Sequence, residues 1–325
     1  RRRRLANLHD KSSSCEFADK KPVDAEAPSD EDVEEAVVCK VTDSDLLHCL
    51  SKLLDCGSGG SSQKPKLVLK RAWSVHAPAQ QDAYEANKAK VLRQLEQVSK
   101  AKGPKRMEPV STLTDIAVEK LGLDASCNEK VLLHGARVVS TQAILRCGIN
   151  EGRSSEAAFG FGAYLAESCR KIDLDAEVDT PGAGDEEAKQ LHKLLYEDHG
   201  DQHPGEVCYA FVCHVCLGCP VYTKGPAHPE MPTSTCGPAG SFKEGLPVFA
   251  NGSRFNKLAP IPGTSPPVRY HSLIVEEEPK GHAEQHRKFV LFDSDAVLVK
   301  YLVAYARKPN VGNELSDDLV NIPAL

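Results

Sequence analysis

The hydrophobic positions between residues 129 and 167 change from a strand-like run to helical spacing. Residues 131–133 form a continuous apolar run, which favours a buried strand with His134 at its end. From residue 138 to residue 145 the apolar positions recur at helical spacing, and Gly148 stands where a left-handed helix stop is expected. The pattern predicts a strand, a tight turn and a helix.

A glycine-rich turn follows this unit. Gly160 and Gly162 stand two residues apart, so the backbone can turn sharply and leave room for a flat group to lie against it. Tyr164 comes next, on a segment that we expect to be a short strand. His134 and Tyr164 carry most of the functional information in the chain.

Similar patterns predict the other elements. Leucines recur at helical spacing after Ser44, a cap residue, and predict one short helix within residues 36–56. Apolar runs of strand type and longer amphipathic patterns predict the remaining strands and helices. The predicted strands are 67–77, 206–217, 270–275, 288–293 and 296–306, and the predicted helices are 78–102, 112–123 and 186–200.

Composition divides the chain into four parts. Residues 1–35 are charged and Ser-rich, which predicts disorder, and their opening RRRR fits a nuclear localisation fragment or a solvated tail. Residues 36–65 hold the short helix and a Gly/Ser linker, where we expect the main domain boundary. Residues 66–306 form the main domain, and residues 307–325 form a C-terminal tail. The chain begins without Met, so we expect a fragment of a longer protein.

Charge and hydrophobicity narrow the class of partner. A chain of 325 residues with a hydrophobic fraction of 41% can bury a core. A net charge of −6 and a pI near 6.1 argue against a nucleic-acid partner. No run approaches the roughly 18 apolar residues of a spanning helix, and no secretory signal is present. We therefore expect an intracellular protein, nuclear or cytoplasmic, with no membrane partner.

The spacing of some cysteines is typical of a metal site. We expect the twelve cysteines of such a chain to be free thiols rather than a disulfide framework. Cys208, Cys213, Cys216 and Cys219, with His214 among them, resemble a zinc ligand set. Their segment is nevertheless of strand type, and alternation sends Cys213 and Cys216 to opposite faces. We expect a strand and no metal, with a structural zinc site as the alternative.

Two motifs carry a family resemblance. N-E-K-V-L-L-H-G-A at residues 128–136 and F-G-F-G-A-Y-L-A-E at residues 159–167 resemble the NAD-binding signature of the poly(ADP-ribose) polymerase (PARP) family of ADP-ribosyltransferases. Weaker matches extend the resemblance over residues 66–306. It implies an α+β fold with an ADP-ribosyltransferase-like split, mostly antiparallel β-sheet core flanked by helices. The alternative is an unrelated α/β domain in which His134 is a satisfied core histidine and Tyr164 is packed.

The resemblance implies a reaction and a cofactor. ADP-ribose passes from NAD, used as a substrate, to protein side chains through an oxocarbenium-like state, with release of nicotinamide. By resemblance, His134 hydrogen-bonds a ribose hydroxyl, Gly135 leaves its backbone open to the carboxamide, and Tyr164 stacks on the nicotinamide with its hydroxyl available. The implied NAD-binding residues are His134, Gly135, Ala136, Arg137, Gly162, Tyr164, Ala166, Ile172 and Asp175, and the implied catalytic positions are His134, Tyr164 and Lys288.

Three positions depart from the family pattern. Ile172 stands where an alanine or a carboxamide-binding serine would stand, and Asp175 where a second tyrosine would close the nicotinamide site. Lys288 replaces the glutamate of polymerising members, and its ammonium group only donates hydrogen bonds and opposes positive charge on the sugar. These departures predict mono-ADP-ribosylation rather than polymer synthesis. The alternatives are a silent module that binds NAD or a protein partner, and a zinc-stabilised interaction domain.

Two further features bear on activity. Glu276, Glu277, Glu278 or Glu284 could replace the missing glutamate only through tertiary folding, since Glu284 lies about 13 Å from Lys288 along an extended strand. The Pro/Gly/Ser-rich segment 224–268 corresponds either to the region that approaches the acceptor protein or to a surface insertion.

Overall fold

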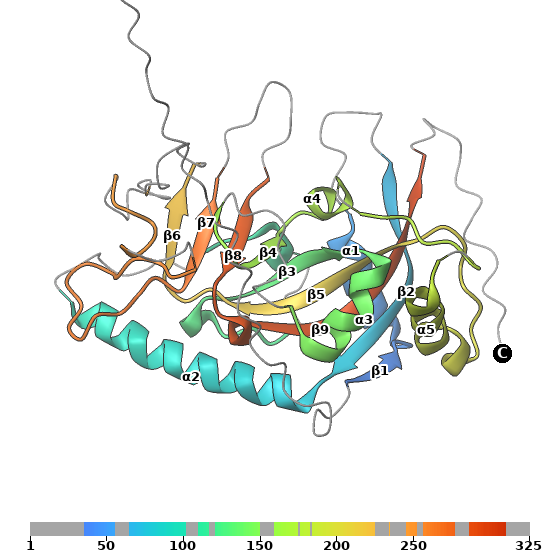
Figure 1. Cartoon of the computed structure of the whole chain (residues 1–325), viewed down its shortest axis with the longest axis horizontal. Helices are drawn as coiled ribbons and strands as arrows, with labels where there is room; N and C mark the ends of the chain where they lie inside the picture. Colours follow the sequence, from blue (N-terminus) through green and yellow to red (C-terminus); the bar gives the residue numbers. More distant parts are fainter. Residues whose placement is uncertain are drawn as a thin grey trace, which may run out of the picture. The chain divides into compact units, whose positions relative to one another are not determined.

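A nine-stranded sheet forms the centre of the described chain, in the order β1-β2-β9-β5-β3-β4-β8-β7-β6 (Figure 1). The computed structural model describes residues 36–55, 65–101, 110–116, 121–149, 159–174, 176–182, 184–224, 234, 245–251, 256–276 and 286–309. The strands are β1 (Val37–Lys40), β2 (Lys66–His76), β3 (Glu129–Ala136), β4 (Ala163–Ala166), β5 (Cys208–Cys216), β6 (Pro220–Thr223), β7 (Ser272–Val275), β8 (Lys288–Leu291) and β9 (Val297–Lys308). The helices are α1 (Ser44–Leu53), α2 (Pro78–Lys100), α3 (Val138–Cys147), α4 (Cys169–Leu174) and α5 (Glu186–Leu195).

The sheet is mostly antiparallel, and its two halves are joined in the middle by a single residue pair between β3 and β4. β6 and β7 pair in parallel, while the other paired strands of the described chain run antiparallel. β3 pairs with β5 from Glu129 to Ala136, but it meets β4 at the single pair Leu133 and Ala166. Beyond that pair β3 and β4 diverge. The predicted α+β class with a mostly antiparallel sheet is confirmed.

Helices cover both faces of this sheet, because alternate residues of the central strands point to opposite sides. Leu145 of α3 and Leu191 of α5 join one hydrophobic cluster, which also holds the fully buried Trp73. Leu53 of α1 and Ile172 of α4 join a second cluster on the opposite face. The indole Nε1 of Trp73 donates a hydrogen bond to the carbonyl of residue 195 (2.9 Å) and so fastens α5 to β2.

The long helix α2 runs along one side of the sheet (Figure 1). Its Tyr84 packs against Cys216 and Leu298, where β5 ends and β9 begins. The Tyr84 hydroxyl donates to Glu129 Oε1 (2.6 Å), and Lys88 Nζ lies 3.3 Å from Glu129 Oε2. The buried carboxylate of Glu129 therefore connects α2 to the first residue of β3.

The described residues 36–55, which precede the Gly/Ser linker, pack onto the same sheet as the residues that follow it. β1 pairs with β2 in an antiparallel register from Val37 to Lys40, and α1 packs on the same core. The boundary expected at the Gly/Ser linker stays a prediction, because residues 56–64 lie outside the described residues. The helix cap is Asp43, whose side chain accepts from the amide of residue 46 (2.7 Å), rather than Ser44.

The helix expected at residues 112–123 does not form in the part of it that the structure describes. A 3-10 turn covers Leu113–Ile116, and residues 121–123 are not helical. Leu113 is exposed and its amide donates to Glu167 Oε2 (3.2 Å), while Thr114 hydrogen-bonds the carbonyl of Val131 through its hydroxyl. Side-chain and backbone contacts with the sheet replace helical hydrogen bonds here. Residues 1–35 and 310–325 lie outside the described residues.

The cysteine-rich segment forms the strand that its pattern predicted. Cys208, Cys213 and Cys216 are buried along β5, and the described residues contain no group of these cysteines that could hold a metal ion. Cys169 is disulfide-bonded, whereas the following described cysteines carry free thiols: Cys39, Cys49, Cys127, Cys147, Cys208, Cys213, Cys216 and Cys219.

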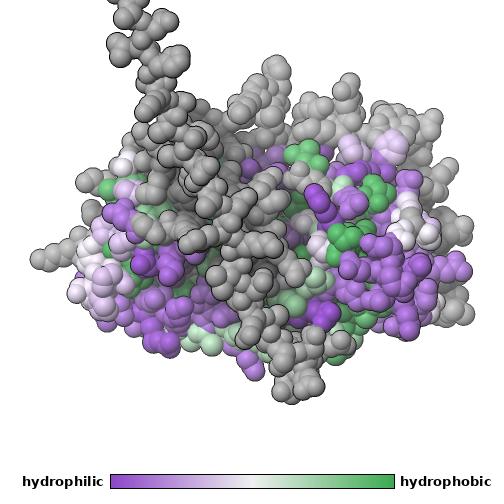
Figure 2. Space-filling model, in the orientation of Figure 1, coloured by the Kyte–Doolittle hydropathy of each residue, from purple (hydrophilic) through white to green (hydrophobic). Residues whose placement is uncertain are grey.

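The described surface is mainly hydrophilic on the face shown in Figure 2, with hydrophobic residues in smaller patches. Among the residues that the structure describes, the large exposed hydrophobic side chains come from separate segments: Val37, Leu113, Val139, Phe161, Leu174 and Val178. Scattered exposure of this kind needs no partner to explain it. None of the described helices is long and apolar enough to cross a membrane.

Candidate functional site

A cavity opens where β3 and β4 diverge. Its volume is about 180 Å³, and α3 forms its second wall. The cavity is lined by His134, Ser140, Ala143, Ile144, Cys147, Gly148, Ile149, Gly162, Ala163 and Tyr164. Both residues singled out from the sequence, His134 and Tyr164, therefore border one hollow, as do the helix stop and the glycine-rich turn.

The imidazole of His134 has a fixed orientation. Its Nδ1 lies 2.8 Å from the backbone carbonyl oxygen of Tyr164, and because a carbonyl only accepts, Nδ1 carries the proton. Burial lowers the pKa of His134, although the carbonyl partner opposes this shift, so the ring is neutral at pH 7. Nε2 then has a lone pair and can accept a hydrogen bond from a ligand hydroxyl.

The Tyr164 ring can contact a ligand, whereas its hydroxyl is hydrogen-bonded within the protein. The hydroxyl donates to the carbonyl of Gly160 (2.8 Å) and accepts from the amide of Phe159 (3.3 Å). The expectation that the Tyr164 hydroxyl remains available is therefore wrong, because it closes the glycine-rich turn. Gly160 has φ +93°, a conformation that favours glycine, so this turn depends on both the glycine and the tyrosine.

Gly162 is required by a neighbouring strand. A Cβ at this position would lie 2.6 Å from the carbonyl oxygen of Leu291 and 2.8 Å from Val290 Cγ1. The missing side chain therefore makes room for β8, in addition to any flat ligand that lies against the turn.

Gly162→Ala should accordingly destabilise the fold. We expect a loss of about 1–2 kcal/mol in the free energy of unfolding, because β4 and β8 must separate to admit the methyl group. Urea unfolding of both proteins measures it. Gly200→Ala is the comparison for backbone strain without a steric contact, since its φ is +69° and no atom lies within 4 Å of the added carbon. A loss below about 0.5 kcal/mol for Gly162→Ala would contradict the steric explanation.

Gly135 and Ile172 lie against each other. A Cβ on Gly135 would lie 3.0 Å from the carbonyl oxygen of Ile172 and 3.3 Å from its Cβ. Ile172 is buried in α4, and its side chain offers no hydrogen bond to a carboxamide. Asp175 lies outside the described residues, and the nearby Asp173 pairs with Arg307 Nε (2.9 Å).

Ala136, Arg137 and Ala166 have structural surroundings. Ala136 is buried and faces Tyr209 of β5, while Arg137 is exposed and caps α3, its carbonyl accepting from the amide of residue 141 (3.0 Å). Ala166 joins the two halves of the sheet, because it faces Leu133 of β3 on one side and Lys288 of β8 on the other.

Lys288 begins β8, two strands away from β3. Its ammonium group lies 5.3 Å from the centroid of the Phe159 ring, which places its charge against the glycine-rich turn. The neighbouring Arg287 binds Glu167 (Nη2 to Oε2, 2.6 Å) and lies 4.0 Å from Glu276 Oε1. Two carboxylates beside Lys288 are thus paired with an arginine. Glu277, Glu278, Glu284 and most of the 224–268 segment lie outside the described residues.

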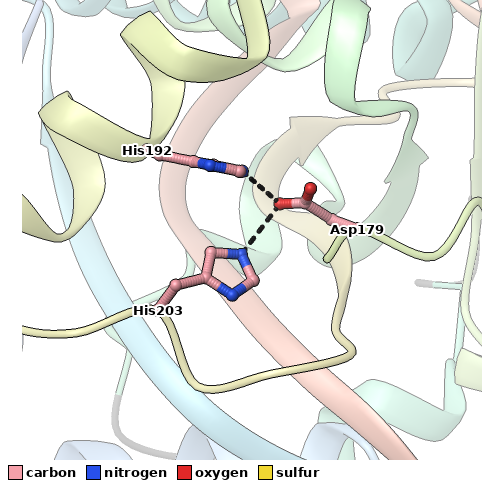
Figure 3. Close-up of side chains that lie close together, drawn as sticks. All are labelled: Asp179, His192 and His203. Atoms are coloured by element: carbon pink, nitrogen blue, oxygen red, sulfur yellow. Dashed lines mark hydrogen bonds and ion pairs between the residues drawn. The ribbon is translucent and has the colours of Figure 1, made fainter. Parts of the chain in front are cut away.

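The structure also brings together three residues that the sequence did not connect. Asp179, His192 and His203 converge beside β5 (Figure 3). They come from three segments with no motif spacing between them, so tertiary contact alone reveals the cluster. The expectation that the chain holds no metal did not consider these residues.

A scan against protein-family models and a search of curated protein sequences each found no match to this chain. What the chain does has therefore to be inferred from its own residues and their geometry.

Proposed function

We propose that this chain is an NAD-dependent protein ADP-ribosyltransferase similar to the PARP family, one that transfers single ADP-ribose units and releases nicotinamide. The observation that carries the proposal is the neutral His134, held by the Tyr164 carbonyl at a cavity between β3, β4 and α3. The divergence of β3 and β4 after one residue pair supports the finer fold assignment, an ADP-ribosyltransferase-like split sheet.

NAD would lie where the two halves of the sheet separate. His134 Nε2 would accept a hydrogen bond from the nicotinamide ribose, and the Tyr164 ring would stack on the nicotinamide. The backbone of β3 beyond Leu133 has no strand partner on its β4 side among the described residues, so its polar groups can pair with the carboxamide, as backbone groups pair with an added strand. Arg137, exposed at the start of α3, would lie at the edge of this site.

Lys288 favours mono-ADP-ribosylation over polymer synthesis. Its positive charge opposes the charge that develops on the ribose, and Arg287 already pairs with Glu167 and Glu276. An acceptor protein that presents its own carboxylate would supply the missing negative charge. The expected partners are therefore acceptor proteins, with NAD as the second substrate and no nucleic acid favoured.

A silent NAD-binding module is the second candidate function. It is favoured by Ile172, which stands beside Gly135 and replaces a hydrogen-bonding side chain with an apolar one. Both candidates predict NAD binding, but they differ in turnover. Nicotinamide released by the wild-type chain at saturating NAD, with an acceptor protein present, separates them.

His134→Ala tests the NAD site that both candidates share. We expect a loss of about 1–2 kcal/mol in NAD binding, roughly a five- to thirtyfold rise in Kd, because a ligand hydroxyl loses its acceptor. Titration calorimetry gives the affinity, and urea unfolding shows whether the variant is folded. His76→Ala, on the exposed end of β2, is the control and should bind NAD unchanged. Unchanged affinity in a folded His134→Ala protein would remove the proposed site.

A further inference from the structure

Three segments meet at the Asp179 carboxylate. Asp179 is held beside β5 by two backbone hydrogen bonds with Val207 (2.7 and 3.0 Å). His192 lies on the buried face of α5, and His203 lies in the loop that leads into β5. The three side chains are 3, 11 and 8% exposed, so the meeting point is shielded from water.

Both imidazoles direct the same atom at one oxygen. His192 Nε2 lies 2.8 Å and His203 Nε2 lies 3.0 Å from Asp179 Oδ2, as Figure 3 shows. The three atoms all lie within 4.8 Å of one another. Ligand atoms around a tetrahedral zinc ion stand roughly 3.4 Å apart, given zinc–ligand distances near 2.1 Å. Each imidazole nitrogen would therefore move away from the carboxylate oxygen by about half an ångström to admit the ion.

Neighbouring tyrosines hold the carboxylate in place. The Tyr209 hydroxyl donates to Asp179 Oδ2 (2.8 Å) and lies 2.9 Å from the Tyr196 hydroxyl. The Tyr209 hydroxyl is the donor, because a carboxylate oxygen only accepts. Outer hydrogen bonds of this kind orient the carboxylate ligands of metal sites.

The charge of the Asp179 carboxylate and the hydrogen bonding of His203 are compatible with a bound cation. Among the described residues, no Lys or Arg nitrogen lies within 4.0 Å of the buried Asp179 carboxylate. His203 Nδ1 is buried without a hydrogen-bond partner, so the ring makes its polar contact through Nε2, while it also packs against the Tyr196 ring (centroids 4.7 Å apart). A metal–nitrogen bond supplies more free energy at Nε2 than one hydrogen bond does.

We infer that Asp179, His192 and His203 form a binding site for a first-row divalent metal ion of the zinc class. Two imidazole nitrogens and one carboxylate oxygen are ligands that zinc accepts, with a fourth position left open. The bound ion joins α5, the segment 176–182 and the loop before β5, so it stabilises the attachment of α5 to the sheet. The site is separate from the His134 cavity and does not depend on NAD binding.

Metal analysis of the full chain tests this inference. The chain is loaded with zinc, freed of excess by gel filtration, and analysed by mass spectrometry for metal content. We expect one zinc per wild-type chain, and at least about tenfold less in the double variant His192→Gln and His203→Gln. Glutamine keeps an amide donor for Asp179 but removes the metal ligand, so a purely hydrogen-bonded cluster should tolerate the change. His48→Gln, an exposed histidine on α1, is the matched control and should keep its zinc.

X-ray absorption at the zinc edge of the wild-type chain decides the outcome even if the double variant fails to fold. We expect the spectrum to show nitrogen and oxygen ligands around the zinc ion and no sulfur. Sulfur ligands would assign the zinc to cysteines and overturn it. It is likewise overturned by a wild-type chain that stays free of zinc after loading, or by a folded double variant that keeps the metal.

Discussion

Glu129→Ala should lower the free energy of unfolding by about 3–5 kcal/mol, because it leaves several buried groups without their partner. The carboxylate is 3% exposed and accepts hydrogen bonds from the Tyr84 hydroxyl (2.6 Å) and the Asp124 amide (2.7 Å). Lys88 (3.3 Å) and His214 Nδ1 (3.7 Å) also lie beside it. Urea unfolding at pH 7 measures the loss.

Glu85→Ala is the matched control for this substitution. Glu85 also lies near Lys88 (3.7 Å), but its side chain is 54% exposed, so its removal should change stability by less than about 1 kcal/mol. A similar small loss for Glu129→Ala would show that the buried network contributes no more than a surface ion pair.

The same carboxylate predicts a pH dependence. Burial opposes ionisation of Glu129, but His214, Tyr84, the Asp124 amide and Lys88 outweigh it and lower the pKa to about 2. Because the folded-state pKa lies below the ordinary value of 4.5, the contribution is present above pH 4.5 and is lost as the pH falls toward 2. The stability difference between wild type and Glu129→Ala should therefore shrink by roughly 3 kcal/mol across this range.

Local sequence patterns were sufficient for the elements that carry the cavity. The apolar run of β3, the helical spacing of α3 and the glycine at residue 148 are short-range signals, and each predicted its element. β1 was missed because it is an edge strand in which Val38 is the one buried residue, so it shows little alternation. Pairing with β2 stabilises β1, and a distant partner leaves no pattern in the four residues themselves.

The glycine-rich turn could be predicted only in part from its sequence motif. The sequence indicated that Gly162 and Tyr164 matter, but the physical reason for each includes a contact that no local pattern contains. Gly162 lies against Leu291, which is more than a hundred residues away along the chain, and the Tyr164 hydroxyl closes its own turn. The Asp179 cluster has the same origin, since a β-bridge to Val207 brings the carboxylate to two histidines from other segments.

Lys288→Glu should raise nicotinamide release from NAD on the order of a hundredfold. The substitution replaces a cation that opposes the developing oxocarbenium ion with a carboxylate that stabilises it and accepts a ribose hydrogen bond. The position suits this role because β8 pairs with β4 at Ala166, which in turn faces β3 one residue before His134. Release is measured at saturating NAD, so that a change in affinity does not enter the comparison.

Two variants separate the parts of this effect. Lys288→Gln removes the positive charge without adding a carboxylate, and we expect it to give only a small part of the gain. Lys189→Glu makes the same charge change on the exposed surface of α5, where the side chain is 68% exposed, and should leave release unchanged. Since Ile172 still offers no hydrogen bond to the carboxamide, Lys288→Glu should raise the rate without restoring tight nicotinamide binding. Polymer formed by the wild-type chain, or no gain from Lys288→Glu in a folded protein that binds NAD, would show that the catalytic carboxylate comes from another segment.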